Sequence, residues 1–277
     1  MNPRPTTIAE LLDHHDGVLL DAYGVLVDGS GALPGARPLF AELERRRKPY
    51  AIVTNDASRS QETYARRFAG YGITIAPERF VTSGSLLPAY IRALGTPRTL
   101  VLGTEDSFAF VRAGGGIPVE VRAGIELDAV AICDDSGTPF VEGIEVALSA
   151  IVRAVDAGRR PALVLPNPDL VFPKGGGELG FTAGAMALLV EAALARRFPT
   201  ANLVFERLGK PEPHLFRAAA TQLGIAPERL VMIGDQLETD IAGAHAAGIP
   251  AALLAGVSKW DARAALAPTY LLATIEP

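Results

Sequence analysis

Carboxylates follow two runs of apolar residues in the sequence. Asp21 comes directly after the run GVLL of residues 17–20, and Asp235 and Asp240 stand two and seven residues after the end of the run LVMI of residues 230–233. A carboxylate that closes a buried apolar segment is costly unless it is paired or functional. Such a side chain can attack phosphorus as a nucleophile. Paired carboxylates also suit Mg²⁺, which takes one or two of them together with water and phosphate oxygens.

Two further groups supply hydrogen-bond donors and positive charge. Thr54 and Asn55 follow the run YAIV of residues 50–53, and a hydroxyl and an amide there can donate to phosphate oxygens. Lys210, in the segment GKP, offers a point charge that can neutralise a phosphoryl group and keep a carboxylate ionised. The four groups together predict that Asp21 meets a phosphate ester with a magnesium ion close by.

Each group also has an ordinary structural explanation. Asp21 can cap a turn, Lys210 can be a solvated loop residue, and Asp240 can be a solvent-facing residue of a helix. The order of the four groups along the chain, and their common position next to expected strands, favour one shared site over separate explanations.

The elements that must position these residues alternate between short strands and amphipathic helices. The apolar runs predict strands at 17–23, 50–54, 80–82, 100–102, 129–133, 162–165, 230–233 and 251–254. Helical patterns cover 36–47, 58–70, 86–94, 142–156, 182–197, 213–223 and 238–247. This alternation is typical of βαβ units and largely parallel sheets. Such sheets bind ligands at the carboxyl ends of their strands, where the polar groups stand.

The middle of the chain repeats the α/β pattern without polar clusters after its strands. A chain of 277 residues has room for roughly two domains of about 150 residues each. We therefore expect an inserted second domain. Neither Gly-Gly-Gly segment, at 114–116 or 175–177, lies in a G-x-G-x-x-G or Walker-type phosphate loop.

In chain order the four groups resemble the four motifs of the haloacid dehalogenase-like (HAD) superfamily. The segments KPEPHLF and GDQLETDI, the segment DAYGVLVDG, and the stretch NPDLVFPKGGGELGFTAGA of residues 167–185 are similar to its class IIA branch of NagD-like and p-nitrophenyl-phosphatase-like hydrolases. The resemblance implies a Rossmann-like parallel-sheet core at residues 1–85 and 206–277. It also implies an inserted, substrate-selecting α/β cap of the C2 type at residues 86–205.

The resemblance assigns a role to each group. Asp21 is expected to be the nucleophile and a Mg²⁺ ligand, and Lys210 to stabilise its charge and that of the phosphoryl group. Thr54 and the backbone N–H of Asn55 are expected to hold the phosphate. Further metal ligands are expected at Asp235, Asp240 and the backbone carbonyl of Tyr23.

Substrate recognition is expected from the cap. Residues Asn167 and Asp169 of the similar stretch are the candidates there. Caps of this class often help to form dimers, so the resemblance leaves a homodimer open.

Tyr23 departs from the family pattern. Phosphatases of the family carry an aspartate two residues after the nucleophile, which protonates the leaving oxygen and then activates water. A phenol with a reference pKa of about 10 is poorly matched to that work at neutral pH. Asp28 and Asp56 are nearby carboxylates, but we interpret both as turn residues. Tyr23 itself remains a candidate catalytic group.

Composition narrows the class of protein. The net charge of −5 and the pI near 5.5 argue against a dedicated nucleic-acid binder, which usually carries a basic face. The apolar segments are too short to cross a membrane, and one cysteine, Cys133, with no signal peptide predicts a cytoplasmic protein. We expect a Mg²⁺-dependent phosphatase of a small phosphorylated metabolite. The alternatives are a catalytically weak phosphate- and metal-binding or regulatory protein, and a phosphotransferase.

Overall fold

A computed structural model describes residues 2–28, 30–175, 178–256, 258–261, 263 and 265–277. The chain divides into two compact units. Unit 1 comprises Met1–Thr54, Gln61–Val81 and Lys210–Pro277, and unit 2 comprises Asn55–Ser60 and Thr82–Gly209. The chain therefore passes between the units at four points, and two of these lie at Thr54–Asn55 and Gly209–Lys210.

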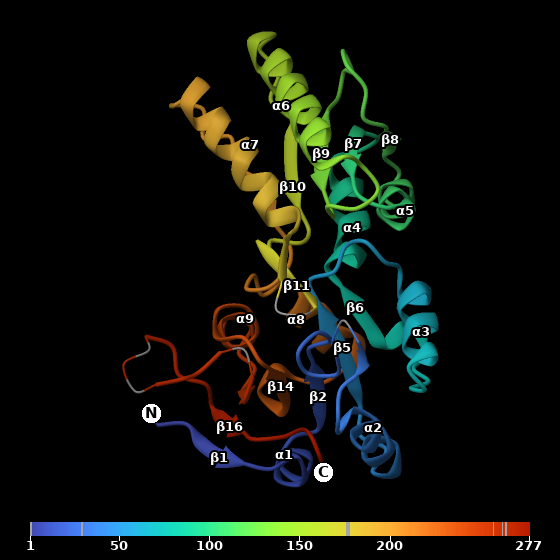
Figure 1. Cartoon of the computed structure of the whole chain (residues 1–277), viewed down its shortest axis with the longest axis vertical. Helices are drawn as coiled ribbons and strands as arrows, with labels where there is room; N and C mark the ends of the chain where they lie inside the picture. Colours follow the sequence, from blue (N-terminus) through green and yellow to red (C-terminus); the bar gives the residue numbers. More distant parts are fainter. Residues whose placement is uncertain (1, 29, 176–177, 257, 262, 264) are drawn as a thin grey trace. The chain divides into compact units, whose positions relative to one another are not determined.

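Unit 1 is built on a seven-stranded sheet in the order β1-β16-β15-β14-β2-β5-β6 (Figure 1). Its strands are β1 (Arg4–Thr6), β2 (Gly17–Leu20), β5 (Tyr50–Thr54), β6 (Phe80–Thr82), β14 (Leu230–Gly234), β15 (Ala251–Leu254) and β16 (Tyr270–Leu272). The neighbouring pairs from β1 to β5 are parallel. The central strands β2 and β14 are buried along their whole length, as apolar runs in a doubly covered parallel sheet must be.

The helices of unit 1 connect these strands. They are α1 (Ile8–His14), α2 (Ala36–Arg45), α3 (Gln61–Gly70), α8 (His214–Leu223) and α9 (Ala242–Ala246), with short 3₁₀ turns at Pro77–Arg79 and Pro227–Arg229. A small hairpin of β3 (Val27–Asp28) and β4 (Gly31–Ala32) follows β2. One face of α2 is apolar and buries Leu39 and Leu43 in the core.

The segment after β14 differs from the expected helix at 238–247. It begins with a π-helical turn, η4 (Leu237–Ile241), and only then continues as α9. The N–H of Ile241 reaches back to the carbonyl of Gln236 at 3.2 Å, and Asp240 N–H donates to the same oxygen at 3.1 Å. π-turns of this kind are frequently found at functional sites.

Unit 2 has a five-stranded parallel sheet in the order β13-β10-β9-β7-β8. Its strands are β7 (Arg98–Leu102), β8 (Ile117–Val119), β9 (Ala129–Ile132), β10 (Ala162–Leu165) and β13 (Glu206–Arg207). The connecting elements are η2 (Ser83–Leu86), α4 (Leu87–Ala93), α5 (Glu105–Ala113), α6 (Phe140–Asp156) and α7 (Ala183–Arg197). A hairpin of β11 (Val171–Gly175) and β12 (Glu178–Phe181) precedes α7.

Two apolar cores cover the two faces of this second sheet. Leu100 and Leu102 belong to the core formed with α6 and α7, which lie together in Figure 1. Val101 belongs instead to the core formed with α4 and α5. Successive side chains of a strand point to opposite faces, so one apolar run serves both cores.

The predicted α/β class, with a parallel-sheet core and a second α/β domain, is confirmed. The sequence prediction missed α5, although Thr104 forms a capping box with Ser107 at its start. It also missed the edge strands β1 and β8 and the strand β16 next to β1. All three are only three residues long and carry little periodic signal. None of the described helices is long and apolar enough to cross a membrane.

Candidate active site

Asp21 is the first residue after β2, at the carboxyl edge of the unit 1 sheet. Its backbone N–H donates to the carbonyl of Ile233 at 3.0 Å, which ties it to the neighbouring strand β14. The residue is only 5% exposed. A carboxylate in this position needs a partner, because leaving water costs several kcal/mol unless the charge is compensated.

Lys210 supplies that partner. Its ammonium group donates to Asp21 Oδ1 at 2.5 Å, to Asp240 Oδ1 at 2.7 Å and to the carbonyl of Val53 at 3.3 Å. The lysine is itself 4% exposed. One buried cation therefore links the ends of β2 and β5 with the π-turn after β14. This arrangement excludes the solvated loop lysine that was the alternative interpretation.

Asp240 is fully buried rather than solvent-facing. Its carboxylate accepts from the backbone N–H of Gln236 at 3.2 Å as well as from Lys210. A Cβ atom at Gly234 would lie 2.3 Å from Asp240 Cβ, so the end of β14 must be a glycine for this approach. The π-turn and Gly234 together direct Asp240 into the site.

Asp235 completes a cluster of three carboxylates with Asp21 and Asp240. One oxygen from each lies within 4.8 Å of the others. Among the described residues, Asp235 Oδ1 is one of two buried side-chain atoms that have no hydrogen-bond partner. A hard divalent cation would provide the missing partner for this Asp235 oxygen and would be bound by all three carboxylates. The residues present therefore fit Mg²⁺.

Burial dominates the ionisation of these carboxyl groups. It raises the pKa of Asp21 to about 8, against the opposing effect of the Lys210 charge. It raises the pKa of Asp235 to about 6, with the Asp240 charge acting in the same direction. The pKa of Lys210 is raised because its two carboxylate partners outweigh its own burial. Below these pKa values the cluster without a metal binds protons, which a divalent cation would displace.

These shifts predict how stability depends on pH. An unfolded aspartate has a pKa of about 3.9, whereas the folded values are about 8 for Asp21 and about 6 for Asp235. Between these limits the folded chain binds more protons, so its stability falls as pH rises. The melting temperature in EDTA is expected to fall from about pH 5 to about pH 8, and the stabilisation by Mg²⁺ to grow over the same interval.

The variant Asp235→Asn provides the control. It cannot ionise, so the part of the pH dependence that lies between about pH 4 and about pH 6 should be lost. A melting temperature in EDTA that stays constant or rises over the interval would contradict the assignment of these pKa values.

Thr54 is the last residue of β5 in unit 1, and its side chain is buried. Asn55 is the first residue of unit 2. The Nδ2 group of Asn55 donates to Asp169 Oδ1 at 2.8 Å, and its carbonyl accepts from Ser83 Oγ at 2.6 Å. Ser83 received no role from the sequence, because a serine after a short strand is common turn chemistry.

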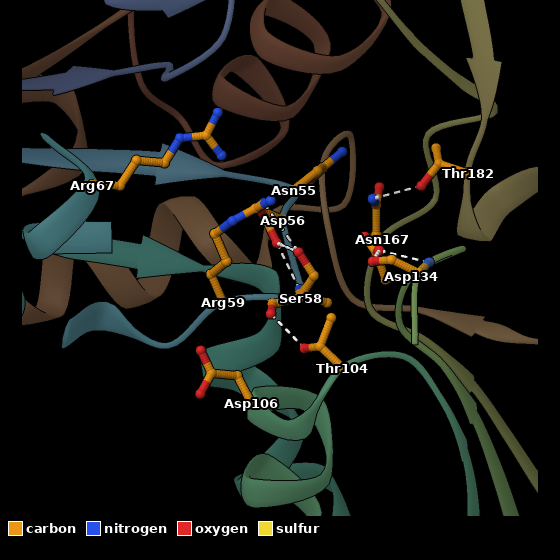
Figure 2. Close-up of polar contacts among 12 residues, drawn as sticks. Asn55, Asp56, Ser58, Arg59, Arg67, Thr104, Asp106, Asp134, Asn167 and Thr182 are labelled. Carbon is orange, nitrogen blue, oxygen red and sulfur yellow. Dashed lines mark hydrogen bonds and ion pairs between the residues drawn. The ribbon is translucent and has the colours of Figure 1, made fainter. Parts of the chain in front are cut away.

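Asn167 and Asp169 also lie in unit 2, between β10 and β11. Asn167 is buried, and its Oδ1 accepts from the backbone N–H of Asp169 at 3.0 Å. Its Nδ2 lies 3.5 Å from Thr182 Oγ1, a contact drawn in Figure 2. Asn167 and Asp169 therefore use part of their hydrogen-bonding groups in contacts within unit 2.

Tyr23 is half-buried and forms an isolated β-bridge with Val27. The guanidinium carbon of Arg67, on α3, lies 5.4 Å from the centre of its ring, and Arg67 Nε donates to the hydroxyl of Tyr71 at 2.9 Å. Arg67 received no role from the sequence, because one arginine in an amphipathic helix carries no positional signal.

The two nearby carboxylates are held in turns, as expected. Asp28 Oδ1 accepts from the N–H and the hydroxyl of Ser30, which lowers the pKa of Asp28. Asp56 Oδ1 accepts from the N–H and the hydroxyl of Ser58, and its Oδ2 accepts from Arg59 at 2.5 Å (Figure 2). Both are Asx-type turns, and neither geometry indicates an acid–base residue.

Comparison with known proteins agrees with this geometry. Residues 18–116 match the family described as haloacid dehalogenase-like hydrolase, and residues 207–276 match a HAD-hydrolase-like family. Human chronophin is 33% identical over 93% of this chain and 87% of its own length.

Two solved structures are also similar to the chain. A possible sugar phosphatase of the HAD superfamily from Cytophaga hutchinsonii has a TM-score of 0.86 at 26% identity, over 100% of this chain and 99% of that chain. A glycerol phosphate phosphatase from Mycobacterium tuberculosis, solved in complex with magnesium, has a TM-score of 0.79 at 28% identity, over 98% of this chain and 78% of that chain.

The chain belongs to the haloacid dehalogenase-like hydrolase family. The predicted resemblance, including the class IIA branch, is confirmed, and the protein is an enzyme of this family.

Proposed function

We propose that this enzyme is a Mg²⁺-dependent phosphomonoester hydrolase that acts through an aspartyl-phosphate at Asp21. The observation that carries the proposal is the position of the Asp21 carboxylate. It lies 2.5 Å from the ammonium group of Lys210 and within one cluster with Asp235 and Asp240. Phosphatase relatives that match 93% or more of this chain support the same chemistry.

In the proposed reaction an oxygen of Asp21 attacks the phosphorus, and the bond to the leaving oxygen breaks. The leaving oxygen takes up a proton from solvent and departs as an alcohol. Water then attacks the phosphorus of the aspartyl-phosphate and loses a proton to solvent. The bond between phosphorus and the Asp21 oxygen breaks, which releases inorganic phosphate and restores the Asp21 carboxylate. Lys210 neutralises charge on Asp21 and on the phosphoryl oxygens throughout.

Asp21, Asp235, Asp240 and the backbone carbonyl of Tyr23 are proposed to hold Mg²⁺. The ion would supply positive charge to the phosphoryl oxygens. Thr54 and the backbone N–H of Asn55 are proposed to hold the phosphate. Unit 2 is proposed to act as the cap that selects a small phosphorylated metabolite. Contact of Asn167 and Asp169 with that metabolite remains a prediction from the sequence.

A second candidate function rests on Tyr23. With a phenol where the family's phosphatases carry a carboxylic acid, the chain would bind phosphate and metal and hydrolyse slowly. General acid–base help is typically worth about 10²–10⁴-fold in rate, so a chain without it would act as a weak enzyme or a phosphate-binding protein.

Hydrolysis is expected to depend on the divalent cation. Purified protein incubated with a panel of phosphate monoesters should release inorganic phosphate in MgCl₂ and lose this activity in EDTA. Ca²⁺ offers the matched control, because it takes more ligands at longer distances and suits the compact cluster poorly. Release that is equal in MgCl₂ and in EDTA would contradict the proposal. Phosphate binding without release would favour the second candidate function.

A further inference from the structure

The segment Asn55–Ser60, which follows the proposed phosphate-binding Thr54, is held by groups of unit 2 along most of its length. The carbonyls of Asn55, Ala57 and Ser58 accept from the hydroxyls of Ser83 at 2.6 Å, Ser107 at 2.8 Å and Thr104 at 2.5 Å, the last drawn in Figure 2. The N–H of Ser60 donates to Asp106 at 2.8 Å. The backbone of this segment is therefore preorganised by α5 and by the turn after β6.

The side chain of Asn55 is held from a different part of the unit. Its Nδ2 donates to Asp169 Oδ1 at 2.8 Å across 114 residues of sequence. A Cβ atom at Gly209 would lie 2.5 Å from Asn55 Oδ1, so the glycine before Lys210 leaves room for the carboxamide. Asn55 is buried, and a buried carboxamide that loses its acceptor pays a desolvation penalty.

Asp169 is itself fixed from two sides. Its N–H donates to the buried Asn167 at 3.0 Å, and its carbonyl accepts from the N–H of Gly184 at 3.0 Å. A Cβ atom at Gly184 would lie 2.5 Å from that carbonyl oxygen, so the N-terminus of α7 can approach only because residue 184 is a glycine. The acceptor that meets Asn55 thus has little freedom to move.

We propose that Asp169 is a positioning residue for Asn55. By accepting from Nδ2, together with Ser83 at the carbonyl, it holds Asn55 in the backbone conformation from which the N–H of Asn55 meets a phosphate oxygen. This role rests on the proposed function. It differs from direct contact with the substrate, because it acts on the phosphoryl group common to all esters and not on the leaving group.

Inorganic phosphate is the probe that separates the two roles, because it has no leaving group. In the presence of Mg²⁺, Asp169→Ala is expected to weaken binding of inorganic phosphate, measured by calorimetry, by about tenfold. The same factor should appear in kcat/KM for every ester tested. Asp169→Asn keeps an acceptor oxygen and should stay within about threefold of the wild type.

A double-mutant cycle provides the sharper test. If Asp169 acts only through Asn55, then adding Asp169→Ala to Asn55→Ala should change phosphate affinity by less than about twofold. The control is Asp156→Ala, which removes an exposed ion pair with Arg197 in the same unit and should leave phosphate binding unchanged. Melting temperatures identify any variant that fails to fold. If Asp169→Ala is such a variant, Ser83→Ala provides the alternative test, because it removes the hydroxyl that donates to the Asn55 carbonyl.

Three results would overturn the positioning role. They are unchanged phosphate affinity in Asp169→Ala, losses in kcat/KM that differ from ester to ester, and additive losses in the cycle. Failure of the proposed function has a different signature, because the wild-type chain itself would then not hydrolyse phosphate esters.

Discussion

Replacement of Asp21 by asparagine is expected to lower kcat for phosphate esters by about 10⁴-fold or more, the size of effect seen when a catalytic nucleophile is removed. The amide is a poor nucleophile and cannot form the acyl phosphate. It is nearly isosteric with the carboxylate and can still accept from Lys210, so the fold should persist. Steady-state release of inorganic phosphate measures the loss, and the melting temperature shows that the variant is folded.

The matched control is Asp28→Asn. This residue lies on the same segment after β2, and its side chain accepts from Ser30 in a turn. Asparagine keeps an acceptor oxygen for that turn, so turnover should change little. If Asp21→Asn retained more than about a tenth of wild-type turnover, an effect of only about 1.4 kcal/mol, the aspartyl-phosphate mechanism would be rejected.

The substitution Tyr23→Asp is expected to raise kcat for alkyl phosphate esters by about 10²-fold, at the lower end of the range for general acid–base catalysis. An alkoxide leaving group needs a proton, which a carboxylic acid at this position could donate. The gain should be much smaller for p-nitrophenyl phosphate, because nitrophenolate departs readily without a proton. Measuring both esters with one enzyme preparation separates acid catalysis from a general change in the site.

Arg67 should limit the gain. Its guanidinium carbon lies 5.4 Å from the centre of the Tyr23 ring, and a nearby cation favours the ionised form of a carboxyl group. The introduced acid would then be held ionised and would donate its proton poorly. The gain is therefore expected to be larger when Tyr23→Asp is combined with Arg67→Gln.

Tyr23→Phe tests the phenol itself. Unchanged turnover on both esters would show that the hydroxyl takes no part in proton transfer, whereas a loss confined to alkyl esters would identify Tyr23 as the acid. If Tyr23→Asp failed to raise turnover on alkyl esters in either background, the lack of a carboxylic acid at position 23 would not be what limits hydrolysis.

The class of fold follows from the sequence for a simple physical reason. Strands that are buried on both faces must be nearly all apolar, so β2, β5 and β14 stand out as runs, and parallel connections require helices between them. Because the carboxyl ends of parallel strands share one edge, Asp21, Thr54 and Asp235 could be expected to gather there. The structure places each of them at or directly after its strand, and their roles remain a proposal.

Other features of the site could be decided only by the tertiary structure. The pattern around Asp240 predicts a helix, and this prediction alone does not say whether the Asp240 side chain faces solvent or the site. The π-turn, and the lack of a side chain at Gly234, allow the Asp240 carboxylate to point into the site. Lys210 lies 189 residues from Asp21 in the sequence, and the pairing of Asn55 with Asp169 spans 114 residues.

The sequence by itself therefore determined which residue types stand at the strand ends, because local polarity patterns record burial directly. Only the tertiary structure decided which of them meet, which carboxylate is satisfied by Lys210, and which oxygen of Asp235 is left without a partner. Those outcomes depend on distances of a few ångström between distant segments, and no local pattern of residues encodes such distances.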